Sequence, residues 1–186
     1  MKYLIVGDTI IDENIFLKSI GISLETPTMK TEYISKEVLF GGAANVAISL
    51  AKYEENISFI TSLSQEKVSI FKREYPSINI INCFQGKDNI KKRYWIRHGD
   101  SVYKYLQVNN TNLDKYNSKI DYLELSSFDI IAFSDYRCGL INSSFITKCT
   151  KTKSKTYASS QVSSRRSNYE KYINVDIIVC NEKESI

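Results

Sequence analysis

The sequence predicts an α/β fold in which helices flank a parallel sheet and a second, smaller sheet stands off it. Short apolar runs alternate with segments of helical periodicity along most of the chain. Two extended stretches, at about residues 14–40 and 88–108, interrupt this alternation. Polar residues directly follow several apolar runs, as they do where parallel strands end at a ligand site.

Six short runs of residues are expected to be strands of the main sheet, the first of them continuously apolar, as buried parallel strands are. These runs are residues 3–6, 57–61, 78–83, 128–133, 156–159 and 175–180. Helical segments are expected between them at residues 41–51, 65–75, 116–125 and 141–150, with a helical turn at 169–172.

The two interruptions predict extended structure outside the main sheet. Residues 14–40 contain short extended pieces around Gly21 and Pro27, with no helix of useful length. In the second interruption, a Gly99-Asp100 turn lies between two alternating aromatic runs and predicts a hairpin. We expect the hairpin strands to pair with residues 28–34 and so complete the small sheet.

Length and composition predict one globular domain. The chain has 186 residues, 42% of them apolar and 25% charged. Its net charge of +4 is spread along the chain and gives no nucleic-acid signature. No apolar run has membrane-spanning length, and the four cysteines lack metal-ligand spacing. These features predict a cytoplasmic protein that binds neither nucleic acid nor membranes.

The segment from residue 41 to 51 organises the rest of the chain. Gly41 and Gly42 open an apolar helix that carries Asn45 in its first turn. Such a helix start exposes backbone N–H groups and lets a ligand approach closely. A tight turn before a core helix explains the same glycines, and the spacing alone leaves both interpretations open.

Polar residues gather where the expected strands end. Asp8 and Asp12 follow the first strand, Asp135 follows the fourth, and Asn181 and Glu184 follow the sixth. A turn or helix-capping role remains open for the first two aspartates. The carboxyl ends of parallel strands share one edge of a sheet, so we expect these side chains at one edge. Asp8, Asp12 and Asn45 are expected to converge in a single pocket.

The order of these motifs resembles that of the ribokinase-like (phosphofructokinase-B) carbohydrate kinases. The matching segments are Gly7-Asp8 with Asp12, the glycine pair at 41 and 42, Lys91 to Tyr94, Ser134 to Tyr136 with Gly139, and Asn181 to Glu184. Within that family the sequence is most similar to the kinase module of heptose-7-phosphate kinases of lipopolysaccharide or surface-polysaccharide synthesis.

The resemblance implies a sugar site at the start of the residue-41 helix. Sugar hydroxyls would be held by five residues: Asp8, Asp12, Gly41, Gly42 and Asn45. The small sheet would be a lid that closes over the substrate and joins two copies of the chain in a homodimer. Lys91, Arg93 and Lys104 in this lid would bind a phosphate already present on the sugar.

The resemblance also implies ATP and Mg²⁺. Asn181 and Glu184 match an N-x-x-E motif that acts on the metal and the nucleotide phosphates, with Glu184 reaching the metal through water. Asp135 would support either the substrate or the phosphates. A nucleotide-sugar or dinucleotide enzyme fits less well, because no glycine-rich phosphate turn follows Gly7.

One part of the family pattern has no match in this sequence. Members carry their catalytic aspartate in a G-x-G-D turn beyond the N-x-x-E motif, whereas the Gly-Asp pairs here lie at Gly7-Asp8 and in the hairpin turn. We therefore expect a C-terminally incomplete family fold with no catalytic residue in this chain, which alone would not transfer a phosphoryl group. The alternative is a non-catalytic sugar-binding or assembly module derived from such a kinase.

Overall fold

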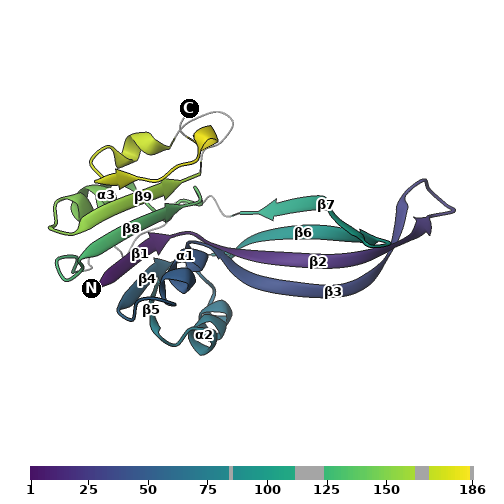
Figure 1. The fold of residues 1–186 in the computed structure, drawn as a ribbon, viewed down its shortest axis with the longest axis horizontal. Coiled ribbons are helices and arrows are strands. Elements are labelled where there is room, and N and C mark those ends of the chain that lie inside the picture. The colour runs from purple at the N-terminus through teal and green to yellow at the C-terminus, as the bar shows by residue number, and fades with distance from the viewer. Residues whose placement is uncertain (84–85, 112–123, 162–167, 185–186) are drawn as a thin grey trace.

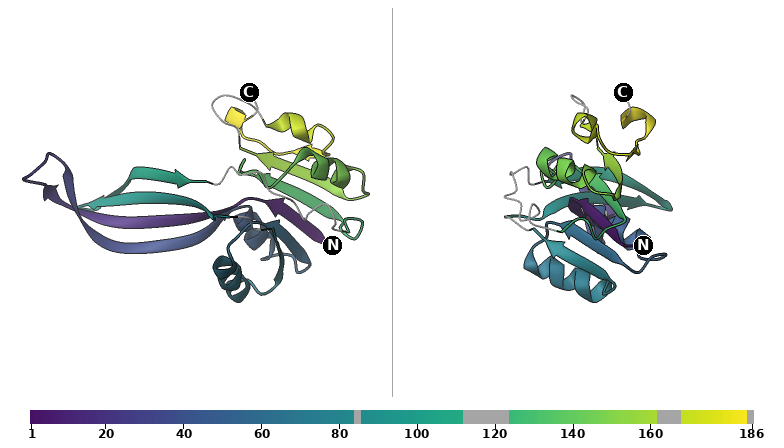
Figure 2. Two further views of the ribbon diagram at one scale, coloured as in Figure 1. Left: turned by 180° about the vertical axis from the view of Figure 1, so that it is seen from behind. Right: turned by 90° about the vertical axis from the view of Figure 1, so that its left-hand side faces the viewer.

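The computed structural model describes residues 1–83, 86–111, 124–161 and 168–184 (Figure 1). A six-stranded parallel sheet forms the body, with strand order β10–β9–β8–β1–β4–β5. A second sheet of four strands, ordered β3–β2–β6–β7, projects from the body as a long arm (Figures 1 and 2). The predicted α/β class with a small additional sheet is confirmed.

The elements of the body lie close to their expected positions. Its strands are β1 (Tyr3–Gly7), β4 (Ile57–Thr61), β5 (Ile78–Asn82), β8 (Ile130–Asp135), β9 (Lys155–Ser160) and β10 (Ile177–Ile178). Its helices are α1 (Ala43–Leu50), α2 (Gln65–Glu74) and α3 (Ser143–Thr150), with the 3-10 turns η2 (Tyr169–Tyr172) and η3 (Glu182–Glu184). Most of the helix expected at residues 116–125 falls outside the described residues. Among the residues that are described, no helix is both long and apolar enough to cross a membrane.

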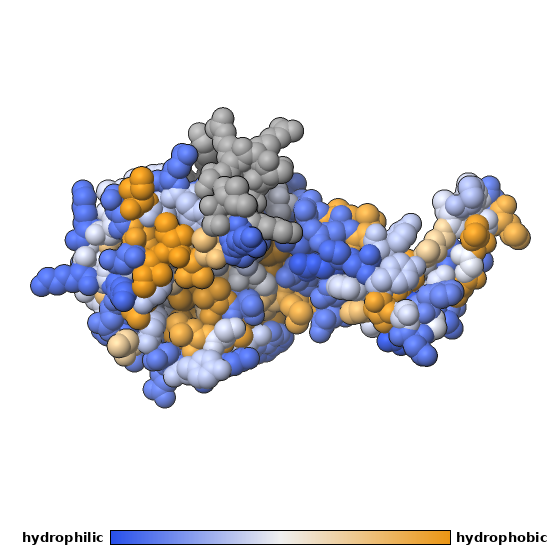
Figure 3. Space-filling model, turned by 45° about the horizontal axis from the view of Figure 1, so that its top comes forward, coloured by the Kyte–Doolittle hydropathy of each residue, from blue (hydrophilic) through white to orange (hydrophobic). Residues whose placement is uncertain are grey.

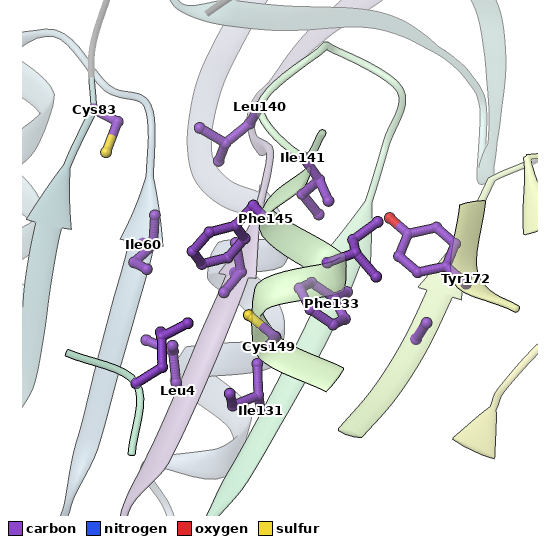
Figure 4. Close-up of a cluster of buried hydrophobic side chains, with 14 residues drawn as sticks. Leu4, Ile60, Cys83, Ile131, Phe133, Leu140, Ile141, Phe145, Cys149 and Tyr172 are labelled. Carbon is purple, nitrogen blue, oxygen red and sulfur yellow. The ribbon is translucent and has the colours of Figure 1, made fainter. Parts of the chain in front are cut away.

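The central strand β1 is apolar throughout because both of its faces are covered. Leu4 and Val6 belong to a core that contains α3 and η2, whereas Tyr3 and Ile5 belong to a core that contains α1 and α2. Figure 4 shows the first core, in which aromatic and aliphatic side chains of α3 lie over the sheet. Strand alternation therefore divides one apolar run between two hydrophobic layers.

The arm consists of two long hairpins laid side by side. Its strands are β2 (Thr9–Ile22), β3 (Met29–Gly42), β6 (Asn89–His98) and β7 (Ser101–Asn110). β2 pairs antiparallel with β3 and parallel with β6, and β6 pairs antiparallel with β7. The predicted hairpin around Gly99 is thus confirmed.

The expected pairing within the arm is wrong. Tyr94 of β6 lies opposite Ile15 of β2, so β2 separates the hairpin from β3 and its residues 29–34. The reason is that β2 begins at Thr9, with only Asp8 between it and the end of β1, and runs from the body straight into the arm. What the sequence suggests to be a loop with short extended pieces is a continuous strand.

Candidate functional site

The junction between the arm and the body is built by one short crossing of the chain. Asp8 is the single residue between β1 in the main sheet and β2 in the arm. The arm's other long strand, β3, ends at Gly42, and α1 begins at the next residue. The backbone oxygen of Asp8 accepts the N–H of Ala43 at 3.0 Å, which fixes the start of α1 against this crossing.

A pocket of about 390 Å³ lies at this junction. Residues from both sheets, from α1 and from two loops at the carboxyl edge of the body surround it. They are Ile10, Asp12, Leu39, Phe40, Gly41, Gly42, Asn45, Lys91, Arg93, Tyr136 and Gln161. The sequence-predicted residues Asp12, Gly41, Gly42, Asn45, Lys91 and Arg93 are therefore brought together in one place.

Asp12 is held firmly within the pocket. Its Oδ1 accepts a hydrogen bond from Nη1 of Arg93, so the carboxylate and the guanidinium form an ion pair. A β-carbon added to Gly41 would lie 2.3 Å from Oδ2 of Asp12. A larger residue at this position would displace the Asp12 carboxylate, so the glycine preserves the position of that carboxylate.

The two cations of β6 differ in their pairing. Arg93 is engaged by Asp12, whereas the side chain of Lys91 makes no ion pair or hydrogen bond with any described residue. Lys104 does not line the pocket: it lies on β7 opposite Trp95, further out along the arm, and its Nζ donates to Gln107 at 3.4 Å. The expectation that Lys104 joins the other two cations is corrected.

Asp8 also departs from its expected place. Its side chain is completely buried and does not line the pocket. The carboxylate accepts the backbone N–H groups of Tyr136, Cys138 and Leu140, at 3.0, 3.1 and 3.4 Å. Burial, followed by the nearby charge of Asp135, raises the pKa of Asp8 to about 6. The predicted convergence therefore holds for Asp12 and Asn45 but not for Asp8.

Asp135 is likewise withdrawn from the pocket. It is 2% exposed, and four groups donate to its carboxylate. The donors are the backbone N–H of Arg137 and the side chains of Asn168, Lys171 and Tyr172. The Asp135 carboxylate thus connects the end of β8 to η2, and the expectation that it binds the substrate in this pocket is corrected.

The pocket contains two polar residues that sequence reasoning did not single out as ligands. Tyr136 follows β8 and Gln161 follows β9, so both come from the carboxyl edge of the main sheet. Burial, with smaller effects from Asp12 and Glu184, raises the pKa of Tyr136. The signal that could have found them is their position directly after an expected strand.

Asn181 and Glu184 bind each other around η3. The backbone N–H of Asn181 donates to Oε2 of Glu184, and the N–H of Glu184 donates to Oδ1 of Asn181, both at 3.0 Å. This reciprocal capping leaves Oε1 of Glu184 without a partner among the described residues. Across all of the described residues, no group of three His, Cys, Asp or Glu side chains could hold a metal. A single carboxylate fits Mg²⁺, which keeps several of its waters and also takes ligands from phosphates.

The inner face of the arm becomes aromatic beyond the pocket. Strand alternation puts Asn14, Phe16 and Trp95 on the same face as Asp12 and Arg93. Trp95 donates its indole N–H to Asn14 at 3.0 Å and stacks on Phe16 with a centroid separation of 6.4 Å. This face can shield a ligand in the pocket from water if the arm approaches the body.

Comparison with solved structures identifies the architecture. A carbohydrate kinase from Agrobacterium tumefaciens matches all of this chain and 62% of its own, with a TM-score of 0.66 and 12% identity. Ribokinase from Thermotoga maritima matches 99% of this chain and 60% of its own, with a TM-score of 0.59 and 20% identity. This is the ribokinase-like fold. Phosphofructokinase-2 from Escherichia coli, solved with fructose-6-phosphate, shares it at a TM-score of 0.59 and 14% identity over 87% of this chain and 55% of its own.

Sequence relatives agree with the ribokinase-like fold. The bifunctional proteins HldE of Trichlorobacter lovleyi and Sulfurimonas denitrificans are 23% and 24% identical over 194 and 197 residues. The match covers the whole of this chain but only 40% and 41% of those proteins. No family model matches the sequence. The resemblance to ribokinase-like carbohydrate kinases is thus confirmed, and it extends over about two fifths of the length of these relatives.

Proposed function

We propose that this chain supplies the sugar-binding and lid portion of an ATP-dependent kinase that acts on a sugar or a sugar phosphate resembling heptose 7-phosphate. The observation that carries the proposal is the pocket at the root of the arm, where Asp12, Asn45, Lys91 and Arg93 converge. A ligand with several hydroxyls and one anionic group matches this set of acceptors, donors and cations.

The hydroxyl-binding part of the site is Asp12 with Asn45. A carboxylate accepts from two neighbouring hydroxyls, and an amide both donates and accepts. Because Arg93 already holds one oxygen of Asp12, the carboxylate is oriented before the sugar arrives. Gly41 and Gly42 form the wall beside it and leave room for the sugar ring.

The phosphate-binding part is Lys91, with Arg93 beside it. Lys91 is the cation whose charge no described residue neutralises, so a phosphate on the substrate would supply its counter-ion. Arg93 can share its guanidinium between Asp12 and the phosphate, since it carries five N–H donors. Movement of the arm toward the body would then exclude water from the bound sugar.

The nucleotide side of the reaction is assigned to the carboxyl edge near η3. Glu184 would hold Mg²⁺ through water, and Asn181 would orient the phosphates of ATP. The bound metal would neutralise charge on the transferring phosphoryl group. The four free cysteines, three of them buried, support a reducing compartment such as the cytoplasm.

We further propose that two copies associate through the arm. Many large apolar side chains of the arm are exposed, and Figure 3 shows apolar side chains gathered toward its end. The exposed apolar residues of the arm include Ile22, Leu24, Tyr33, Val38, Val102, Tyr105 and Leu106. Exposed apolar surface on a sheet of this kind favours association.

The proposal is tested by titration calorimetry with heptose 7-phosphate. Wild type is expected to bind, and Asp12→Asn to bind at least about tenfold more weakly, which corresponds to about 1.4 kcal/mol. Asp176→Asn is the control, because Asp176 is exposed and accepts from Thr156 outside the pocket. Unchanged binding by Asp12→Asn would contradict the assignment of the sugar site.

A second candidate function is a binding or assembly module that keeps the sugar site and performs no transfer. It is favoured by the withdrawal of Asp8 and Asp135 from the pocket, which leaves fewer charged groups facing the ligand. Titration with heptose 7-phosphate in the presence and absence of ATP and Mg²⁺ discriminates the two: a sugar affinity that ATP changes supports the kinase portion, and sugar binding that ATP does not affect supports the module.

A further inference from the structure

The buried carboxylate of Asp8 lies at the crossing between the two sheets and has no role in the site described so far. It has no exposure to solvent, and its three partners are backbone N–H groups of one short loop. Among the residues that the structure describes, no lysine, arginine or histidine side chain forms an ion pair with it. Those N–H groups, from Tyr136, Cys138 and Leu140, are the groups that stabilise its negative charge.

The loop has the backbone geometry of an anion-binding nest. Its donors come from alternate residues, and the two residues between them have positive φ: 62° at Arg137 and 94° at Gly139. When residues of right-handed and left-handed backbone conformation alternate, their N–H groups point to the same side, where one anion can accept from several of them. The N–H of Arg137 donates instead to Asp135 at 2.7 Å.

The nest has an energetic cost that its occupant offsets. Arg137 is the one described residue other than glycine with positive φ, a conformation that is strained for an ordinary residue. Such backbone persists where surrounding contacts fix it. Asp135 holds the N–H of Arg137 itself, and the Asp8 carboxylate holds the residues on either side of it, of which Tyr136 forms a wall of the pocket.

We propose that Asp8 is a positioning residue and not a sugar ligand: its carboxylate fills the nest of residues 136–140 and so holds Tyr136 in the wall of the pocket. The effect on sugar affinity rests on the proposed function, whereas occupancy of the nest does not. Since Asp8 also joins β1 to β2, the same residue fixes the root of the arm relative to the loop.

An emptied nest should accept a small carboxylate from solution. Asp8→Ala removes the anion and leaves a space lined by three N–H groups, which formate can enter. Amide hydrogen exchange at Cys138 and Leu140 reports the state of the nest, and the fluorescence of Trp95, the only tryptophan, reports ligand in the pocket. In Asp8→Ala we expect exchange at these amides to accelerate at least about tenfold.

Formate is expected to restore protection of both amides and to recover heptose 7-phosphate binding, whereas chloride at equal ionic strength does neither. Asp12→Ala is the contrast: it weakens binding, keeps the amides protected and gains nothing from formate. Asp176→Ala is the matched control, because it removes another carboxylate that accepts from the backbone, at Thr156, and should change neither readout.

Asp8→Asn is the second variant, and it carries the test if Asp8→Ala does not fold. The amide has the same shape but one acceptor, and we expect faster exchange at the amides, weaker sugar binding and no response to formate. The inference is overturned if both Asp8 variants keep wild-type exchange at Cys138 and Leu140, or if formate leaves a folded Asp8→Ala unchanged. Absence of sugar binding in wild type, with the exchange results intact, would contradict the proposed function alone.

Discussion

At the scale of single residues, Gly7 shows how closely two strands approach beside the site. A β-carbon added there would lie 2.0 Å from the backbone oxygen of Ser134 on β8 and 2.6 Å from the side chain of Ala43. The backbone oxygen cannot move aside without disturbing the β1–β8 ladder. The glycine is therefore required by packing between the central strands.

Gly7→Ala is expected to lower the free energy of unfolding by about 3 kcal/mol, the upper end of typical overpacking costs. Urea denaturation monitored by circular dichroism measures this loss. Gly99→Ala is the control: it has positive φ and open space around it, so it should lose only about 1 kcal/mol. Equal losses in the two variants would contradict the packing explanation.

The ionisation of Asp8 predicts a particular dependence of stability on pH. Its pKa is raised from 3.8 to about 6 in the folded protein, so between these values the folded state binds more protons than the unfolded state. The contribution of Asp8 to the free energy of unfolding therefore falls as pH rises from about 4 to 6. The charge of Asp135 acts on Asp8, and burial, with smaller effects from Asp8 and Asp135, raises the pKa values of the neighbouring Cys138 and Tyr172.

Unfolding free energies of wild type and Asp8→Asn, measured at several pH values, test this sign. The difference between the two proteins should change between about pH 4 and 6, with wild type losing stability relative to the variant as pH rises. A constant difference, or a change in the opposite direction, would show that the pKa of Asp8 is not raised.

At the scale of elements, Asp88 connects the arm to α2. Its two carboxylate oxygens accept the backbone N–H and the hydroxyl of Ser64, both at 2.7 Å. Ser64 is the N-cap of α2, and Asp88 immediately precedes β6. One side chain thus fixes the start of a body helix and the start of an arm strand.

Asp88→Ala is expected to lower the free energy of unfolding by about 2 kcal/mol, because two charge-assisted hydrogen bonds are lost. Ser69→Ala is the comparison: its hydroxyl donates to Gln65 within the exposed face of the same helix, and its loss should stay within about 0.5 kcal/mol. Similar effects in chemical denaturation would show that Asp88 does not join the two elements.

The strands of the body could be predicted from the sequence, whereas the arrangement of the arm could not. The body strands other than β9 are short, mainly apolar runs, and burial on both faces maintains that pattern, as in β1. The arm strands are exposed over much of their length, so their sequence carries weaker alternation. Which strand lies beside β6 depends on β2 leaving the body without a turn, a feature of backbone direction that residue pattern does not encode.

The same distinction applies to the candidate site. Asp12 and Asn45 could be predicted to share a pocket because one follows the first strand and the other begins a helix, whereas Lys91 is expected near them only through the family resemblance. The role of Asp8 could not be predicted, since its donors lie 128 to 132 residues later in the chain. Their N–H groups converge only through the φ values of Arg137 and Gly139.

At the scale of the whole molecule, the arm predicts self-association. Light scattering of wild type is expected to give the mass of a dimer, and Leu106→Glu to give the mass of the monomer. Leu106 is 47% exposed beside other apolar arm residues. Tyr53→Glu, which changes an 84% exposed residue of the body, should remain dimeric. A wild type that is monomeric at high concentration would contradict association through the arm.

The central claim is that the pocket at the root of the arm binds a phosphorylated sugar, and Lys91 provides its most direct test. The measurement is Trp95 fluorescence during titration with heptose 7-phosphate and with the unphosphorylated heptose, in wild type, Lys91→Met and Lys104→Met. We predict that wild type prefers the phosphorylated sugar, that Lys91→Met loses about tenfold in affinity for that ligand alone, and that Lys104→Met behaves as wild type. Equal affinity of wild type for the two sugars, or an unchanged preference in Lys91→Met, would contradict the account.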